Sequence, residues 1–267
     1  MVNTGLLLIR RSLAAAIRSL FEISLDADDI SLELCYPKYD AHYTSAIALA
    51  IKHRIANGES FQPNQIAEAI ANWIAQNQEI VTHYQVQAIG KGWLNILLND
   101  EYLGLSFQAL ETLRIQDLVN VDGCWQRVKT MAEVKNTNSS SELIGQYVYA
   151  RCCSLIRLAQ REHEFSTNNT LDLKTSLQTV EISLLLHNLA IADHLSCELS
   201  CLNTKNISKV RSGLARSLAE LFLDFYDHCQ IFGVSSDIAY RRIVLIRVSQ
   251  KLLLAITPSE FNYSMSL

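Results

Sequence analysis

Proline is almost missing from this sequence. Only three prolines occur among its 267 residues, and none lies between Asn64 and Thr257. Because proline interrupts helices while Leu, Ala and Ile are common in them, so long a proline-free stretch predicts a largely helical protein. No apolar run reaches the roughly 18 residues that a membrane span requires. The sequence therefore predicts no membrane partner.

The residue patterns of common metal, nucleotide and hydrolase sites are missing as well. The seven cysteines form no C-x-x-C pair and the seven histidines form no H-E-x-x-H, so we expect buried thiols and no metal site. Gly90-Lys91-Gly92 lacks the ending of a phosphate-binding loop, and G-x-S-x-G does not occur. We therefore predict no catalytic residues and no cofactor. The unpaired cysteines favour a reducing, cytoplasmic location.

Charge is sparse and slightly negative. The 23 Lys and Arg against 27 Asp and Glu give a net charge of −4, which excludes a globally basic nucleic-acid binder. Residues 1–125 carry 8 basic and 14 acidic side chains, whereas residues 126–267 carry 15 and 13. The second half is therefore the better candidate for contact with a polyanion.

The first 100 residues alternate between the helical period and the two-residue period of strands. The expected elements are helices at 6–21, 44–55 and 63–74, and strands at 30–35, 84–89 and 93–98. The last two strands are joined by a short glycine-rich turn, which is typical of a hairpin. This order predicts a compact α+β domain over residues 1–100, with a small antiparallel sheet and helices.

The rest of the chain has a helical period. Residues 101–130 show little periodicity and residues 136–141 have the composition of a linker, so residues 101–141 are expected to form a connector. Four amphipathic helices are then expected at 144–161, 177–195, 214–229 and 238–255. They predict an all-α helical bundle over residues 142–267.

Two stretches of this second half carry the motifs of a known family. Residues 146–157 read Q-Y-V-Y-A-R-C-C-S-L-I-R, which resembles the Q-Y-A-x-A-R-x-x-S-I-x-R helix of the arginyl-tRNA synthetase family. That helix opens the family's anticodon-binding domain, also called the DALR domain. Residues 225–229, F-Y-D-H-C, are similar to the family's F-Y-N-x-C segment, and the near-terminal Met265 matches the end of the family's chains.

The first half is similar to the N-terminal additional domain of the same family. Tyr36-Pro37 with residues 43–48 resembles its P-x(n)-G-D-Y-A-x-N-x-A pattern, although Ala41-His42 replaces the family's Gly-Asp. Residues 90–95, G-K-G-W-L-N, resemble its G-P-G-[F/Y]-[I/L]-N strand. The two matches lie in the family's order.

The resemblance implies tRNA, of the arginine type, as the partner. It places Trp93 and Asn95 on the D-loop side, and it places four residues on the anticodon side, namely Tyr147, Arg151, Tyr226 and Met265. Period two independently puts Leu94, Ile96 and Leu98 on one face of their strand and Trp93 and Asn95 on the other. An aromatic ring beside an amide suits an unpaired base. The alternatives are that Trp93 packs under a helix and that Tyr226 is a half-buried structural tyrosine.

Basic residues gather in three places, one of which contains Arg241, Arg242, Arg247 and Lys251. Arg157, Arg247 and Lys251 are candidates for phosphate contacts, because a tRNA path would need cations along it. The alternative interpretation is that these residues only form a solvated face.

The signatures of catalysis in that family do not occur here. No His is followed by x-Gly-His, no K-M-S-K-like loop follows any Met, and only residues 100–143 separate the two modules. These signatures hold ATP and the adenylate, so we expect no aminoacylation by this chain alone. The leading hypothesis is a non-catalytic tRNA-binding protein. The alternatives are a protein interaction scaffold that has lost RNA binding and an accessory subunit that supports arginine charging together with a partner protein.

Overall fold

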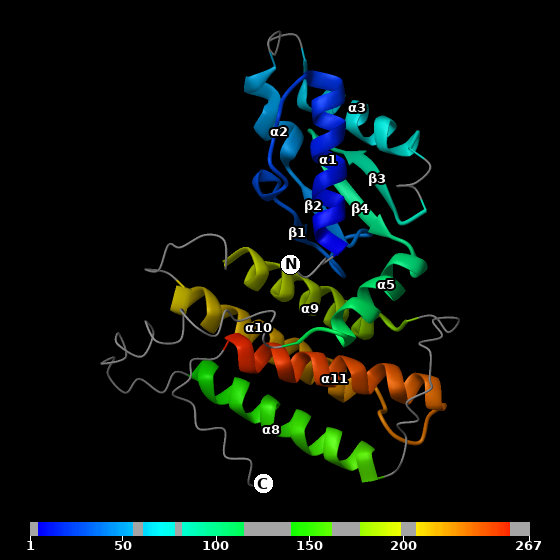
Figure 1. Ribbon diagram of the computed structural model, residues 1–267, viewed down its shortest axis with the longest axis vertical. Coiled ribbons are helices and arrows are strands. Elements are labelled where there is room, and N and C mark those ends of the chain that lie inside the picture. Colours follow the sequence, from blue (N-terminus) through cyan, green and yellow to red (C-terminus); the bar gives the residue numbers. More distant parts are fainter. Residues whose placement is uncertain are drawn as a thin grey trace. The chain divides into compact units, whose positions relative to one another are not determined.

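The computed structural model describes residues 5–55, 61–77, 82–114, 140–161, 177–198 and 207–256 (Figure 1). The chain divides into two compact units, residues 3–106 and residues 107–267, and the division falls within one helix. The first unit combines an antiparallel sheet with helices, and the described part of the second unit contains helices and their connections but no strand. This confirms the fold class expected from the sequence.

The first unit is built on a four-stranded antiparallel sheet with the strand order β1-β2-β4-β3. The strands are β1 (Glu33–Leu34), β2 (Tyr43–Ser45), β3 (Tyr84–Ile89) and β4 (Trp93–Leu98). In the hairpin of β3 and β4, Ile89 lies opposite Trp93 and Tyr84 lies opposite Leu98. Both hairpin strands have the bounds that the sequence predicted.

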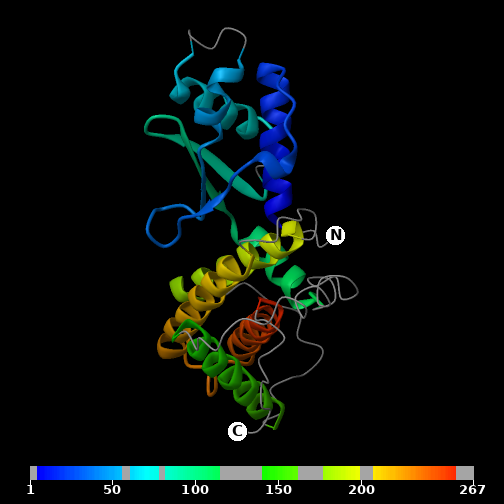
Figure 2. The same ribbon diagram turned by 90° about the vertical axis from the view of Figure 1, so that its left-hand side faces the viewer.

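Helices cover one face of this sheet. They are α1 (Gly5–Phe21), α2 (Ile47–Ile51) and α3 (Pro63–Ala75), and α5 (Asp100–Glu111) follows β4 in the chain. Figure 2 shows α1 and α3 on the same side of the strands. Pro63 begins α3 as predicted, and the backbone N–H of Gln62 donates to the side chain of Gln65 at 2.9 Å, which caps the helix. The core between helices and sheet contains Ile9, Leu13, Ile17, Ile66, Ile70, Leu94 and Ile96.

Two sequence predictions in this unit were wrong in detail. The strand expected over residues 30–35 is limited to Glu33–Leu34. The helix expected over residues 44–55 is divided, because Thr44 and Ser45 pair with Asn95 and Leu94 as part of β2. Only α2 and the 3-10 turn Lys52–Arg54 are helical. Pairing with β4 therefore overrides the local helical spacing.

The second unit contains four long helices, α8 (Ser140–Arg161), α9 (Thr179–Glu198), α10 (Ile207–His228) and α11 (Ser236–Ile256). Helices α10 and α11 contact each other, and each also contacts both α8 and α9. Buried side chains from all four helices form the core, among them Val148, Leu155, Leu185, Leu189, Phe222, Phe225, Ile243 and Leu252. The four helices expected from the sequence are confirmed, although their bounds differ from the expected ones by up to seven residues, at the start of α10.

Among the helices in the described ranges, none is long and apolar enough to cross a bilayer.

Candidate nucleic-acid interface

Trp93 and Asn95 lie on the face of the sheet that α1 and α3 do not cover. Leu94, Ile96 and Leu98 are buried on the opposite face, as the alternation predicted. Trp93 and Asn95 are both half-buried. Their side chains therefore lie at a sheet surface rather than in the core.

The strand register extends this surface across the sheet. Asn95 lies between Thr44 on β2 and Gln87 on β3, and Trp93 lies opposite Ile89. Ile89 is 41% exposed and Leu97 is 37% exposed. The result is a patch of amides and apolar side chains with an indole among them, which we call the sheet patch: Gln85, Gln87, Ile89, Trp93, Asn95 and Leu97. Such a surface can stack on bases and hydrogen-bond to their edges.

The residues that replace the family's Gly-Asp are buried at the border of this sheet. Ala41 is 1% exposed and His42 is 5% exposed. His42 Nδ1 accepts a hydrogen bond from the backbone N–H of Leu98 at 2.9 Å, and the backbone N–H of His42 donates to the carbonyl of Ile96 at 3.0 Å. Burial lowers the pKa of the His42 imidazole, although Asp100 and Asp40 oppose this shift. His42 is thus a neutral structural residue that holds its loop to β4.

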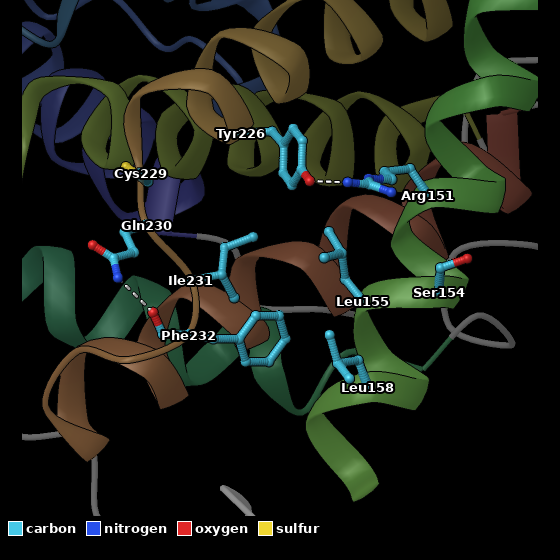
Figure 3. Close-up of a pocket in the computed structure, with 9 residues that line it drawn as sticks. All are labelled: Arg151, Ser154, Leu155, Leu158, Tyr226, Cys229, Gln230, Ile231 and Phe232. Carbon is cyan, nitrogen blue, oxygen red and sulfur yellow. Dashed lines mark hydrogen bonds between the residues drawn. The ribbon is translucent and has the colours of Figure 1, made fainter. Parts of the chain in front are cut away.

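In the second unit, the structure brings two of the predicted anticodon-side residues into direct contact. The guanidinium of Arg151 on α8 lies over the ring of Tyr226 on α10, with its Cζ 4.6 Å from the ring centroid. Arg151 also donates a hydrogen bond to the Tyr226 hydroxyl (Figure 3). Each residue therefore orients the other through a cation–π contact and a hydrogen bond.

These two residues line a pocket of about 380 Å³ between α8, the end of α10 and the loop that follows it. Figure 3 shows Leu155 and Leu158 on α8 facing Ile231 and Phe232 of that loop. The remaining lining residues are Ser154, Cys229 and Gln230. The pocket is largely apolar at one end and carries the Arg151 donors at the other. Burial raises the pKa of the Cys229 thiol to about 11, so this thiol stays protonated.

Sequence reasoning missed the loop wall of this pocket. Ile231 and Phe232 lie just after Gln230, which follows the F-Y-D-H-C segment, and two apolar residues in a short connection carry no signal of a pocket wall. The turn is made by Gly233, which has a φ of +74°. That glycine after Phe232 is the only sequence signal of a specific turn here.

The other predicted residues of this side lie apart from the pocket or outside the described residues. Tyr147 is one helical turn before Arg151 on α8 and is 58% exposed, so it can extend the same face. Arg157 is exposed on α8. Met265 lies outside the described residues.

Lys251 makes structural hydrogen bonds to the backbone. Its ammonium donates to the backbone carbonyl of Leu113 at 2.8 Å and to that of Glu111, the last residue of α5, at 3.4 Å. Burial, together with nearby Arg247, lowers the pKa of Lys251. The phosphate contacts of Arg157, Arg247 and Lys251 stay predictions. For Lys251 the structure shows hydrogen bonds to backbone carbonyls instead.

The expectation that Arg241 and Arg242 lie on a solvated face or a tRNA path was wrong. Their side chains are only 2% and 5% exposed, and both pair with Glu181, which is 0% exposed. The sequence pattern did not indicate this pairing, because Glu181 is 60 positions away from Arg241 and belongs to a different helix.

Among the described residues, no group of His, Cys, Asp and Glu could hold a metal ion. Cys35, Cys152, Cys153 and Cys229 are free thiols, and all but Cys153 are buried.

Comparison with known proteins accounts for both units. Residues 7–98 match the family model described as "Arginyl tRNA synthetase N terminal domain". Residues 145–257 match the model described as "DALR anticodon binding domain". Two separate parts of the chain are thus similar to domains of the arginyl-tRNA synthetase family, and each match covers less than half of the chain. Residues 99–144 separate the two matched regions, and the residues that line the pocket of Arg151 and Tyr226 lie within the region that matches the anticodon-binding model.

Two curated relatives agree with this result. The chain is 32% identical over 111 residues to the protein named arginine–tRNA ligase of Chlorobium phaeovibrioides, which covers 40% of this chain and 19% of that protein. It is also 32% identical over 108 residues to the arginine–tRNA ligase of Pelodictyon phaeoclathratiforme, with the same two shares. The matched part thus spans about a fifth of the length of each relative. No solved structure gives a significant match.

Proposed function

We propose that this chain is a tRNA-binding protein that does not itself catalyse aminoacylation. Two domains of the arginyl-tRNA synthetase family support the proposal, because both belong to enzymes that recognise tRNA. The observation that carries it is the pairing of Arg151 with Tyr226 in a pocket of the anticodon-binding domain. An aromatic ring and a guanidinium plane are the groups on which unpaired RNA bases stack.

The pocket also offers an unused donor. Arg151 Nε is buried and has no hydrogen-bond partner among the described residues. A buried donor without a partner is unfavourable. The sheet patch of the first unit would supply a second contact through Trp93 and Asn95. By the family resemblance the partner is an arginine-type tRNA, with the sheet patch at the D-loop and the pocket at the anticodon loop.

The non-catalytic part of the proposal rests on the sequence. The chain contains neither a His-x-Gly-His sequence nor a K-M-S-K-like loop, and residues 99–144 are too few for a nucleotide-binding catalytic domain. Purified protein should therefore not charge tRNA with arginine when ATP is present. Charging by the chain alone would contradict this part and leave tRNA binding standing.

A native gel shift tests the binding itself. The purified chain is titrated into total tRNA at low and at moderate salt, with a DNA duplex of equal length as the competitor. We expect a shift at micromolar protein that weakens as salt rises, because phosphate contacts release counterions. No shift at either salt concentration would reject tRNA binding and favour an interaction scaffold.

A further inference from the structure

The wall of the pocket is connected to a buried charge cluster. Glu181 on α9 is fully buried and accepts from two arginines of α11: Arg241 at 3.1 Å and Arg242 at 2.9 Å. Replacing such a buried ion pair by apolar residues is often neutral or stabilising. A gain in stability is therefore a weak explanation for this buried cluster. The geometry that the cluster imposes on its neighbours is a better explanation.

Arg242 extends this cluster to the pocket. Its Nε donates to Glu181, and its second donor group binds the backbone carbonyl of Gln230. Gln230 is the first residue of the loop after Cys229, and its own side chain donates to the carbonyl of Phe232 at 2.9 Å. One guanidinium thus fixes a buried carboxylate and the base of the loop at the same time.

Glu181 reaches the same loop by a second route. Its other carboxylate oxygen accepts from the backbone N–H of Gln178 at 2.8 Å, just before α9 begins. The side chain of Gln178 accepts in turn from the Cys229 thiol at 3.3 Å. Both routes end at residues 229–230, which line the pocket together with Arg151 and Tyr226.

From these contacts we propose that Glu181 and Arg242 are positioning residues that hold the 229–232 loop as the fixed wall of the pocket and so set its selectivity for an unpaired RNA base. This deepens the proposed function and rests on it. A rigid wall discriminates among bases because a base of the wrong shape leaves polar groups unpaired or apolar surface uncovered. Arg242 and Glu181 act through the loop and need not contact the RNA.

The sharpest variant is Arg242→Lys. Lysine keeps the positive charge beside Glu181, but it lacks the planar fork that binds a carboxylate and a carbonyl at the same time. Changing Glu181 itself would leave two buried guanidiniums without their carboxylate and is expected to unfold the domain. The matched control is Arg241→Lys, which disturbs the same carboxylate from the neighbouring position.

Two measurements test the proposal on the full chain. The first is affinity for a hairpin with the anticodon arm of an arginine tRNA, divided by affinity for the same stem with abasic loop positions. We expect Arg242→Lys to lower this ratio on the order of tenfold, the scale of one hydrogen bond to a charged group. Arg241→Lys should leave the ratio near that of the parent chain, while both variants lower the urea midpoint. An equal change of the ratio in both variants would overturn the proposal.

The second measurement does not depend on RNA. Cys229 is 3% exposed, so its alkylation by iodoacetamide requires opening of the loop, and peptide mass spectrometry separates it from the other thiols. Arg242→Lys should raise the alkylation rate of Cys229 several-fold more than Arg241→Lys does. Equal rates in both variants would refute the positioning role. If the parent chain binds no RNA, the proposed function fails, and this rate still decides whether Arg242 holds the loop.

Discussion

The backbone of Gly92 lies directly against Pro63. A Cβ on residue 92 would lie 2.5 Å from the Cβ of Pro63, and Gly92 has a φ of +110°. The β3–β4 turn therefore packs against the first residue of α3. The contact is made by Gly92, which directly precedes Trp93. The hairpin that carries the sheet patch is thus held against the helical layer at its turn.

Gly92→Ala is expected to destabilise the first unit by at least about 2 kcal/mol, because a Cβ would both clash and occupy a conformation unfavourable for side chains. The matched control is Gly90→Ala in the same turn. Gly90 also has a positive φ, but no described atom lies within 4 Å of the added Cβ, so the cost should be about 1 kcal/mol. Urea unfolding followed by tryptophan fluorescence measures both, and equal midpoints would contradict the packing argument.

Trp93→Ala is expected to weaken tRNA binding by about 1–3 kcal/mol, the contribution of one stacked base. Trp93→Phe keeps an aromatic face and should recover most of the affinity. Because Trp93 is half-buried on the open face of the sheet, neither change should greatly alter the urea midpoint. If the alanine variant binds as the parent does, then Trp93 is a packing residue and the D-loop contact fails.

Tyr226→Ala should reduce tRNA affinity by a similar amount, because it removes the ring on which Arg151 rests. Tyr226→Phe keeps the ring and loses only the hydroxyl that accepts from Arg151. We expect it to bind within a few-fold of the parent. Fluorescence anisotropy with a labelled anticodon-arm hairpin gives both values. A larger loss in the phenylalanine variant than in the alanine variant would contradict stacking.

The salt dependence of tRNA binding distinguishes a basic residue that contacts phosphate from one that only makes a structural contact. Lys251→Met should lower stability, because its ammonium binds two backbone carbonyls near the end of α5, and should leave the salt dependence of tRNA binding unchanged. Arg157→Gln should lessen the slope of log affinity against log salt by about one if Arg157 contacts a phosphate. A smaller slope in the Lys251 variant would restore its predicted phosphate contact.

Stability should depend on pH through His187 on α9. Its ring hydrogen-bonds with the Ser217 hydroxyl at 2.9 Å, and burial lowers its pKa from 6.5 to about 4. Between these pH values the unfolded chain binds more protons at His187 than the folded chain does. The contribution of His187 to the free energy of unfolding is therefore complete above pH 6.5 and is lost as the pH falls toward 4.

The expected loss is about 2–3 kcal/mol between pH 6.5 and 4.5. His187→Gln retains a hydrogen-bonding side chain and removes the titration, so its free energy of unfolding should fall less over this range. Chemical denaturation at several pH values measures the difference between the two proteins, which cancels the carboxylates that titrate in both. Parallel pH profiles would show that His187 is not protonated on unfolding.

The sequence by itself determined the elements whose signal is local. The β3–β4 hairpin follows from alternation on both sides of two glycines, and α3 begins at Pro63 because proline suits the first turn of a helix. Helices α8 and α10 follow from their 3.6-residue period, whereas α9 is apolar almost all round. The same alternation separated Leu94, Ile96 and Leu98 in the core from Trp93 and Asn95 on the open face.

The tertiary structure decided what depends on partners far apart in the chain. Strand β2 is three residues long, too short for a period, and it exists because β4 supplies its hydrogen bonds. Arg241 and Arg242 are buried because Glu181 of another helix neutralises them, whereas their neighbours in sequence suggest a solvated surface. The contact of Arg151 with Tyr226, 75 positions apart, and the loop wall opposite them arise only when α8 and α10 pack together.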